Sequence, residues 1–337
     1  MSSYLRAALF LCLPVLLSAA DWQIVSVNRI WDQPRHAAFG DLIRWNERWY
    51  CVFREGLGHA PQKGKTDDGK LRVLSSLDGD RWQSEALLEE QGVDLRDPHL
   101  SLTPDNRLMI IAGGSYYPNG EYKSRQSRVF FSRDARAWTL PQKVVEDGQW
   151  LWRATWHNGT AYGVSKFGFG PGPITAESRR IHLVRSNDGA KWETVTELKV
   201  PGGDETSVRF LPDATMIALT RRTWDDGNVA WVGTSKPPYR EWSWNPCRQF
   251  IGGPNFIVLP SGRWVAGGRI FEGGDRTKPY TAVGELTSTG FSEKLRLPSG
   301  GDSSYPGFVW HENLLWTLYY SSHEGKTSIY LAKIRIP

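Results

Sequence analysis

The sequence predicts an all-β protein made of six similar units that close into a ring. Three observations lead to this prediction: short β-branched or aromatic runs bounded by Gly, Pro, Asn or Asp, a recurring turn motif, and a strand–turn–strand pattern that returns six times. No stretch shows a helical hydrophobic period. With 40% hydrophobic and 23% charged residues, the composition is that of a globular protein and excludes a disordered polyelectrolyte.

Residues 1–20 differ in composition from the rest of the chain. Arg6 precedes an apolar run from Ala7 to Leu17, and small residues follow up to Ala20, which is the pattern of a cleavable secretory signal peptide. The run is too short to span a bilayer. We therefore expect a signal peptide over residues 1–20 and one domain over residues 21–337, exported to the periplasm or secreted, with no membrane span.

Charge, cysteine and histidine content indicate which partners, disulfides and metals to expect. The net charge of +5 comes without any block of like charge, so we expect no nucleic-acid or membrane partner. Cys51 and Cys247 remain after the leader and lack metal-ligand spacing; two buried free thiols are favoured, and one disulfide is the alternative. The seven histidines form no metal-binding motif, so we predict no metal and no cofactor.

A turn motif of the form Ser-x-Asp-Gly/Ala-x-x-Trp occurs three times, at intervals of about 55 residues. Each copy follows a strand-like run, so we interpret it as a hairpin turn in which the Asp carboxylate binds turn amides and the Trp enters the apolar layer. We call these the Ser-x-Asp turns and assign them no catalytic role. They span Ser76 to Trp82, Ser132 to Trp138 and Ser186 to Trp192, with a looser fourth copy from Ser235 to Trp242.

The strand–turn–strand pattern gives the number of units. Its turn positions recur about every 53 residues, so six units fill the chain after the leader. Units that are hydrophobic on both faces bury themselves best in a closed ring, which predicts a six-bladed β-propeller of four-stranded antiparallel blades. We expect the strand Trp22 to Trp31 to complete the last blade beside Ile329 to Ile336. A five-bladed propeller and a β-solenoid are the alternatives, against which the count of six and the Asp-containing turns argue. The turn positions are Glu47, Asn106, Gly159, Ala214, Gly262 and Asn313.

The same register predicts a cluster at one mouth of the ring. In each blade the start of the first strand and the end of the second lie at the same mouth, because the two strands are antiparallel. Seven residues after a turn position lie second-strand ends, and eight or nine residues before it lie first-strand starts. Three arginines, two carboxylates and a tyrosine at one mouth indicate an anion-binding catalytic site. They are Arg54, Arg221, Arg269, Asp97, Glu205 and Tyr305.

These residues carry a family resemblance. The Ser-x-Asp turns, the segment from Asp204 to Arg221, then Arg269, then Ser304-Tyr305-Pro306 resemble, in blade order and over nearly the whole chain, the six-bladed Asp-box exo-α-sialidases, or neuraminidases. The resemblance implies a glycosidase that removes terminal sialic acid from glycans with an arginine triad, a Tyr/Glu nucleophile pair and an Asp acid/base.

The sequence departs from that family in the first blade. Such sialidases place the first triad arginine in a Phe-Arg-Ile-Pro motif, where this chain has Ala37-Ala38-Phe39-Gly40. Arg54 is our substitute for that arginine because it occupies the matching mouth position of the first blade. Arg96, in Leu95-Arg96-Asp97-Pro98 one blade later, is the alternative.

The acid/base position departs as well. The family places this Asp in a loop after the first blade's inner strands, and the corresponding loop here contains His59 and Asp67. We favour Asp97 as the acid/base and keep His59 and Asp67 as alternatives.

The chemistry of a sialoside fits these residue types. Its anomeric carbon carries a carboxylate, which guanidinium groups bind through paired charge-assisted contacts. That carboxylate would repel an anionic nucleophile, whereas a neutral phenol whose proton goes to a neighbouring carboxylate avoids the repulsion. We therefore predict Tyr305 as nucleophile, Glu205 as its base and Asp97 as acid/base, with retention of the anomeric configuration.

Three function classes follow from the sequence. We favour a retaining exo-sialidase acting on sialylated glycans or glycoproteins, and we expect a monomer. The first alternative is a glycan-binding propeller with a decayed site, which the absent first-blade arginine motif would suit. The second is a structural propeller that uses the Ser-x-Asp turns for stability alone, which leaves the matched mouth arginines without a purpose.

Overall fold

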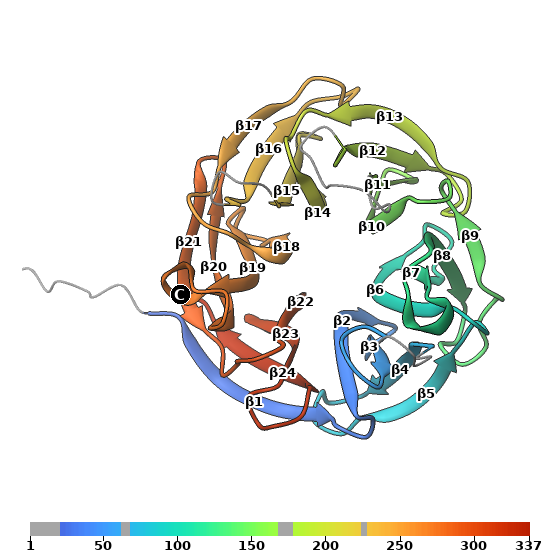
Figure 1. Cartoon of the computed structure of the whole chain (residues 1–337). Coiled ribbons are helices and arrows are strands. Elements are labelled where there is room, and N and C mark those ends of the chain that lie inside the picture. The colour runs from blue at the N-terminus through green and yellow to red at the C-terminus, as the bar shows by residue number, and fades with distance from the viewer. Residues whose placement is uncertain (1–20, 62–67, 168–177, 224–227) are drawn as a thin grey trace, which may run out of the picture.

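The computed structural model describes residues 21–61, 68–167, 178–223 and 228–337. The expected signal peptide and Asp67 lie outside these ranges. Six four-stranded antiparallel sheets are arranged in a ring around a common axis, so the prediction of a six-bladed β-propeller is confirmed (Figure 1).

The first five blades follow one another along the chain, and each uses four consecutive strands. Blade 1 contains β2 (His36–Trp45), β3 (Arg48–Gly56), β4 (Lys70–Ser76) and β5 (Gln83–Leu88). Blade 2 contains β6 (Asp94–Leu102), β7 (Leu108–Tyr116), β8 (Ser124–Ser132) and β9 (Gln142–Val144). Blade 3 contains β10 (Trp150–His157), β11 (Thr160–Lys166), β12 (Ile181–Ser186) and β13 (Glu193–Leu198). Blade 4 contains β14 (Gly203–Phe210), β15 (Met216–Arg222), β16 (Trp231–Ser235) and β17 (Ser243–Pro246), and blade 5 contains β18 (Gly252–Val258), β19 (Trp264–Phe271), β20 (Pro279–Thr287) and β21 (Gly290–Arg296).

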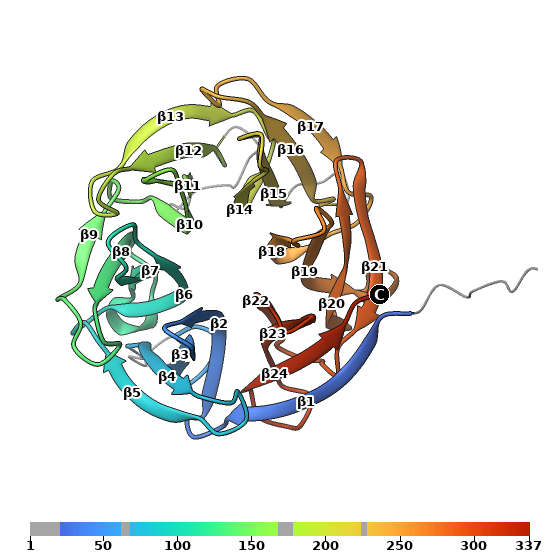
Figure 2. The same ribbon diagram turned by 180° about the vertical axis from the view of Figure 1, so that it is seen from behind.

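The last blade joins the two ends of the domain. It contains β22 (Ser304–His311), β23 (Leu314–Ser321), β24 (Ser328–Arg335) and, as its outermost strand, β1 (Gln23–Trp31). β1 completes this blade beside β24, as expected from the sequence; the register pairs Gln23 with Arg335, and Figure 2 shows β1 lying along β24. The ring is therefore closed by backbone hydrogen bonds between the first and last strands.

The predicted turn positions have a common backbone conformation. All six lie between the first and second strands of their blades, and all have the positive φ of a left-handed turn residue. The φ angles are 61° at Glu47, 59° at Asn106, 78° at Gly159, 63° at Ala214, 82° at Gly262 and 58° at Asn313. The structure thus confirms the register that was used to predict the mouth.

Every first strand has a β-bulge near its start, where two residues face one residue of the second strand. A bulge changes the direction of the side chains it carries, and bulges are over-represented beside functional sites. At four of the bulges the first residue of the bulged pair has the positive φ of a left-handed conformation. These residues are Phe39, Asp97, Gly253 and Tyr305. The six bulged pairs are Phe39-Gly40, Asp97-Pro98, Trp152-Arg153, Asp204-Glu205, Gly253-Pro254 and Tyr305-Pro306.

The Ser-x-Asp turns connect the third and fourth strands of blades 1, 2 and 3, on the face opposite the predicted mouth. In the third copy, Asp188 Oδ1 accepts hydrogen bonds from the amides of Ala190 and Lys191, and Trp192 Nε1 donates to the Gly189 carbonyl. The other two copies make the same contacts. The fourth copy keeps only the indole contact, from Trp242 to Tyr239. These turns bind their own backbone, as the sequence predicted.

The remaining predictions about the chain concern its cysteines and helices. Cys51 and Cys247 are both buried and free, which is the favoured interpretation. The only helical segments in the described ranges are two short 3₁₀ turns, η1 (Pro118–Gly120) and η2 (Glu272–Gly274). None of the helical segments described is long and apolar enough to cross a membrane.

Candidate active site

Tyr305 and Glu205 meet at the mouth predicted from the sequence. The Tyr305 hydroxyl donates a hydrogen bond of 2.9 Å to Glu205 Oε1, although the two residues lie in different blades. Both are buried, with 7% and 4% of their surfaces exposed. A phenol and a carboxylate in direct contact are able to exchange a proton, as a nucleophile and its base must.

Glu205 is fixed by two further donors. Arg221 Nη1 lies 2.9 Å from each carboxylate oxygen, and the amide of Gly253 donates to Oε2 at 2.8 Å. Burial is the largest single influence and favours the protonated acid, but the positive charges of Arg221 and Lys166, with the hydrogen bond from Arg221, together lower the pKa of Glu205. Glu205 is therefore an ionised acceptor facing a neutral phenol.

Tyr305 occupies a restrictive aromatic pocket. Its ring centroid lies 5.4 Å from those of Phe39 and Trp152, so bulge residues from three blades pack together. A Cβ at Gly253 would come within 1.8 Å of the Tyr305 ring, so only glycine fits beneath it. Burial, followed by the negative charges of Glu205 and Asp97, raises the pKa of Tyr305 well above its ordinary value.

Asp97 lies at the equivalent bulge of blade 2. It is 6% exposed, and its Oδ1 atom is buried without a hydrogen-bond partner. Burial raises the pKa of Asp97, Arg96 opposes the rise, and the charge of Glu205 adds to it. A carboxyl group with a raised pKa and an oxygen atom without a hydrogen-bond partner suits a general acid.

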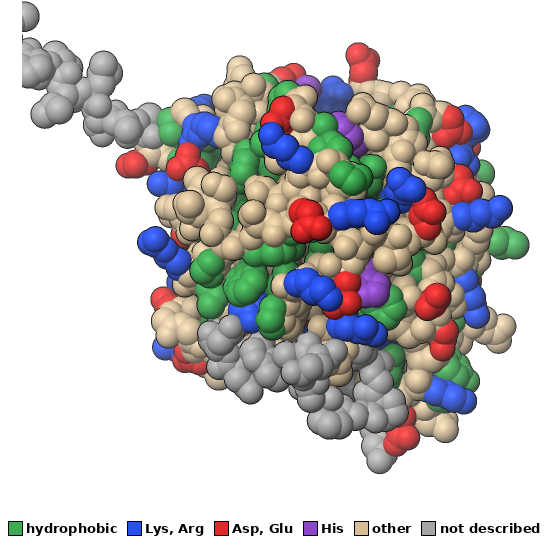
Figure 3. Space-filling model, turned by 90° about the horizontal axis from the view of Figure 1, so that it is seen from above, with side chains coloured by type: hydrophobic (Ala, Val, Ile, Leu, Met, Phe, Trp, Pro, Cys, Tyr) green, Lys and Arg blue, Asp and Glu red, His purple; other side chains and the backbone are tan. Residues whose placement is uncertain are grey.

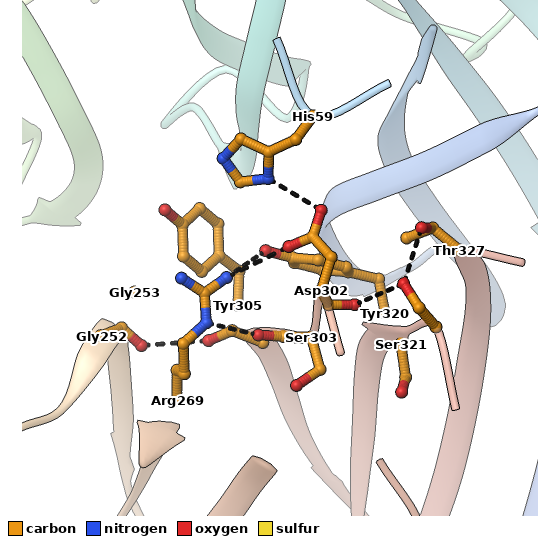
Figure 4. A network of polar contacts seen from close by, with 12 residues as sticks. His59, Gly252, Gly253, Arg269, Asp302, Ser303, Tyr305, Tyr320, Ser321 and Thr327 are labelled. Atoms are coloured by element: carbon orange, nitrogen blue, oxygen red, sulfur yellow. Dashed lines mark hydrogen bonds and ion pairs between the residues drawn. The ribbon is translucent and has the colours of Figure 1, made fainter. Parts of the chain in front are cut away.

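Arg269 lies beside the Tyr305 ring, with its guanidinium carbon 5.8 Å from the ring centroid. Its Nε donates to the Ser303 carbonyl at 2.7 Å and its Nη2 to the Tyr320 hydroxyl at 2.8 Å (Figure 4). Nη2 also lies 3.4 Å from Asp302 Oδ1. These contacts orient the guanidinium toward the centre of the mouth.

Asp302 is a residue that sequence reasoning missed. One of its oxygens lies 2.9 Å from His36 Nε2 and 2.8 Å from His59 Nδ1. Figure 4 shows the contact with His59 and the other oxygen facing Arg269. Burial favours the neutral acid, but the two histidine hydrogen bonds and the nearby positive charge hold the pKa of Asp302 well below its usual range. The sequence offered no signal for it, because it precedes β22 in a connecting segment outside the repeat register.

His59, an alternative candidate for the acid/base, contacts Asp302 and Phe39. Its ring packs edge-on against Phe39, at 5.0 Å between centroids, and binds Asp302. His36, His59 and Asp302 each offer one ligand atom, and these atoms lie within 4.8 Å of one another, so this is the group in the described part of the chain that could hold a metal ion. Arg269 on the same carboxylate supplies positive charge there already.

The structure corrects the position of Arg54. Its side chain is fully buried, and Nε donates to Asp94 Oδ1 at 2.6 Å, so it does not present its guanidinium to the mouth. Asp94 also faces Arg96, at 3.4 Å. Arg96 in turn lies over the Phe39 ring, at 5.0 Å, and donates to the His59 carbonyl. Of the two candidates for the missing arginine, Arg96 reaches the centre, and Arg54 supports it through Asp94.

Figure 3 views the ring from one side, where basic and acidic side chains are interspersed over the visible surface.

Comparisons with known proteins support the fold. No protein-family model matches the sequence, and no curated protein is similar to it. The solved structure of a protein of unknown function from Dyadobacter fermentans superposes with a TM-score of 0.79 at 17% identity, covering 95% of this chain and 100% of that one. The α-L-arabinofuranosidase of Fusarium graminearum gives 0.68 at 14% identity, covering 92% and 97%.

A sialidase is also among the similar structures. The Trypanosoma rangeli sialidase in complex with sialic acid gives a TM-score of 0.63 at 13% identity, covering 94% of this chain and 59% of the sialidase. At these identities the likeness shows a shared propeller fold, and it includes glycosidases of more than one specificity.

Proposed function

We propose that this protein is a retaining glycoside hydrolase that removes a terminal acidic sugar, sialic acid or a related nonulosonate, from glycans. The observation that carries the proposal is the buried hydrogen bond between Tyr305 and the ionised Glu205. A tyrosine nucleophile is the exception among glycosidases, and it suits substrates whose own carboxylate would repel an Asp or Glu.

In the first step a bond forms between the Tyr305 oxygen and the anomeric carbon as the bond to the leaving oxygen breaks. The phenol proton passes to Glu205, and Asp97 gives its proton to the leaving oxygen. In the second step water attacks the same carbon as its bond to the Tyr305 oxygen breaks, Asp97 takes a proton from the water, and Glu205 returns its proton to the Tyr305 oxygen. Two displacements at one carbon retain its configuration.

The arginines support an acidic substrate. Arg269 and Arg96 bring guanidinium groups to the mouth, and Arg221 adds a third beside Glu205. Guanidinium groups keep their charge at any working pH and match the geometry of a carboxylate.

A neutral-sugar glycosidase is the second candidate. Arg221 already binds Glu205, and Arg269 already binds Ser303, Tyr320 and Asp302, so part of their hydrogen-bonding capacity is used within the protein. The arabinofuranosidase of similar fold makes an arabinofuranoside the natural test substrate for this alternative.

The test is hydrolysis of matched fluorogenic substrates, an α-sialoside and an α-L-arabinofuranoside, by the wild type, Tyr305→Phe and Arg269→Ala. Tyr319→Phe is the matched control, because its buried hydroxyl donates to the Pro298 carbonyl and takes no part in the site. We expect sialoside turnover that both site variants lose and the control keeps.

Other outcomes would decide against the proposal. Turnover of the arabinofuranoside alone would support the neutral-sugar alternative. Binding of sialyl-oligosaccharides that needs Arg269, with no turnover of any substrate, would indicate a glycan-binding propeller. Turnover that survives Tyr305→Phe would rule out the nucleophile.

A further inference from the structure

A hollow separate from the Tyr305 site opens on the mouth side of the ring, between blades 4 and 5. It has a volume of about 580 Å³, and its walls come from the segment before β18, the end of β19 and the η2 turn. This volume lies in the range of small-molecule sites. The residues that matter here are Arg248, Gln249, Phe250, Phe271, Arg276 and Tyr280.

This hollow lies beside the Tyr305 site. Phe250 forms part of its wall and lies under Arg221, with the guanidinium carbon 5.5 Å from the ring centroid. Three residues further along the chain, the Gly253 amide binds Glu205. Phe271 comes two residues after Arg269 in β19 and stacks on Phe250 at 5.0 Å. The two sites therefore share a wall.

The lining provides both aromatic surface and positive charge. Arg276 lies 5.8 Å from the Phe271 ring centroid, and neither it nor Arg248 forms an ion pair with a described residue. The Nε2 atom of Gln249 is buried without a hydrogen-bond partner. Aromatic faces pack against sugar rings, a buried donor needs an acceptor, and unneutralised guanidinium groups attract a carboxylate.

We propose that this hollow binds a second acidic sugar unit of the same glycan, so that the protein prefers oligomers of carboxylated sugars to single acidic termini. The inference rests on the proposed function, because the first unit is taken to occupy the Tyr305 site. Because the first unit is the terminal one, the second unit is the sugar on the leaving-group side of the bond that breaks.

The experiment compares Arg276→Ala with the wild type on two substrates, an α2,8-linked sialic acid oligomer and an aryl α-sialoside with no second sugar. We expect kcat/KM on the oligomer to fall about tenfold, as loss of one charge-assisted contact implies, and kcat/KM on the aryl sialoside to stay unchanged. Arg133→Ala is the matched control, since Arg133 is an exposed arginine on the opposite face.

A readout without turnover separates this proposal from the proposed function. Binding of the oligomer to the Tyr305→Phe variant is measured by calorimetry, with and without Arg276→Ala. Weaker binding in the double variant supports the hollow even if no sialoside is cleaved. Equal loss on both substrates, or no loss on either, overturns it.

Discussion

The two faces of the propeller handle their polar groups in opposite ways. On the face of the Ser-x-Asp turns, each carboxylate accepts hydrogen bonds from nearby backbone amides, and the pKa values of Asp134 and Asp188 lie below their ordinary values. At the mouth, Asp97 keeps a buried oxygen without a partner, and the pKa values of Asp97 and Tyr305 are raised.

The difference separates polar groups that stabilise the fold from polar groups whose pKa is perturbed by burial and by neighbouring charges. Local hydrogen bonds hold the turns of one face, while left-handed bulge residues, buried charges and an unsatisfied oxygen are concentrated at the other. Strain and unsatisfied groups of this kind persist where the surrounding structure fixes them, and they cluster at functional sites. Substitutions on the two faces should therefore be distinguishable by what they change.

The largest effect is expected from Glu205→Gln. Gln cannot accept the Tyr305 proton, so kcat/KM should fall by on the order of 10³-fold. Steady-state kinetics measure this, and binding of a substrate by the inactive variant shows that the mouth is intact. A fall of less than tenfold would mean that Glu205 is not the base.

Arg54→Met should mainly destabilise the fold. It leaves the buried Asp94 carboxylate without its 2.6 Å partner, and removing one member of a buried pair costs about 3–5 kcal/mol. Urea unfolding measures the loss, and Arg54→Lys should recover part of it. A raised KM with unchanged stability would instead place Arg54 in contact with the substrate.

Asp97→Asn should reduce kcat/KM by about 10²-fold and change its pH dependence. Because the pKa of Asp97 is raised, the wild type should keep its acid at mildly acidic pH and lose activity as pH rises through that pKa. The variant has no such proton, so its alkaline limb should disappear in a pH–rate profile. An aryl leaving group, which needs little protonation, should suffer less than an alkyl one.

Asp188→Ala should have the smallest effect, and on stability alone. It removes hydrogen bonds of 2.8 and 2.7 Å to two turn amides, at a cost of about 1 kcal/mol, without changing activity. The folded-state pKa of Asp188 is lowered, so its contribution is present above the unfolded-state pKa and is lost as pH falls through the folded-state value. Wild type and variant should therefore converge in stability in acid, and a gap that stays constant with pH would contradict this.

The fold could be predicted from the sequence because the propeller repeats the same local features in every blade. Five of the six turn positions are polar or glycine residues between short apolar runs, the sixth is Ala214, and all six have left-handed φ. The same count brought Tyr305, Glu205, Arg221 and Arg269 to one mouth, where the structure shows them in contact or nearly so. Their catalytic roles remain predictions.

The parts that could not be predicted are those that repeat register does not determine. The position of Arg54 at a second-strand end was correct, but register does not tell whether a side chain there faces the axis or the interior. Asp302 and His36 come together only after six blades have closed, so no local pattern marks them. The bulges were not predicted either: Asp97, Gly253 and Tyr305 each precede a proline, which favours extended backbone, yet all three have positive φ.

The pairing of β1 with β24 has a consequence for how the chain is made. β1 is synthesised among the first strands, but residue 23 must pair with residue 335. Until β24 emerges from the ribosome, β1 has no strand to pair with and the ring is open. A chain that stalls or is cut before β24 exposes bare strand edges, which readily pair with other chains. Closure of the ring thus has to wait until β24 has been translated.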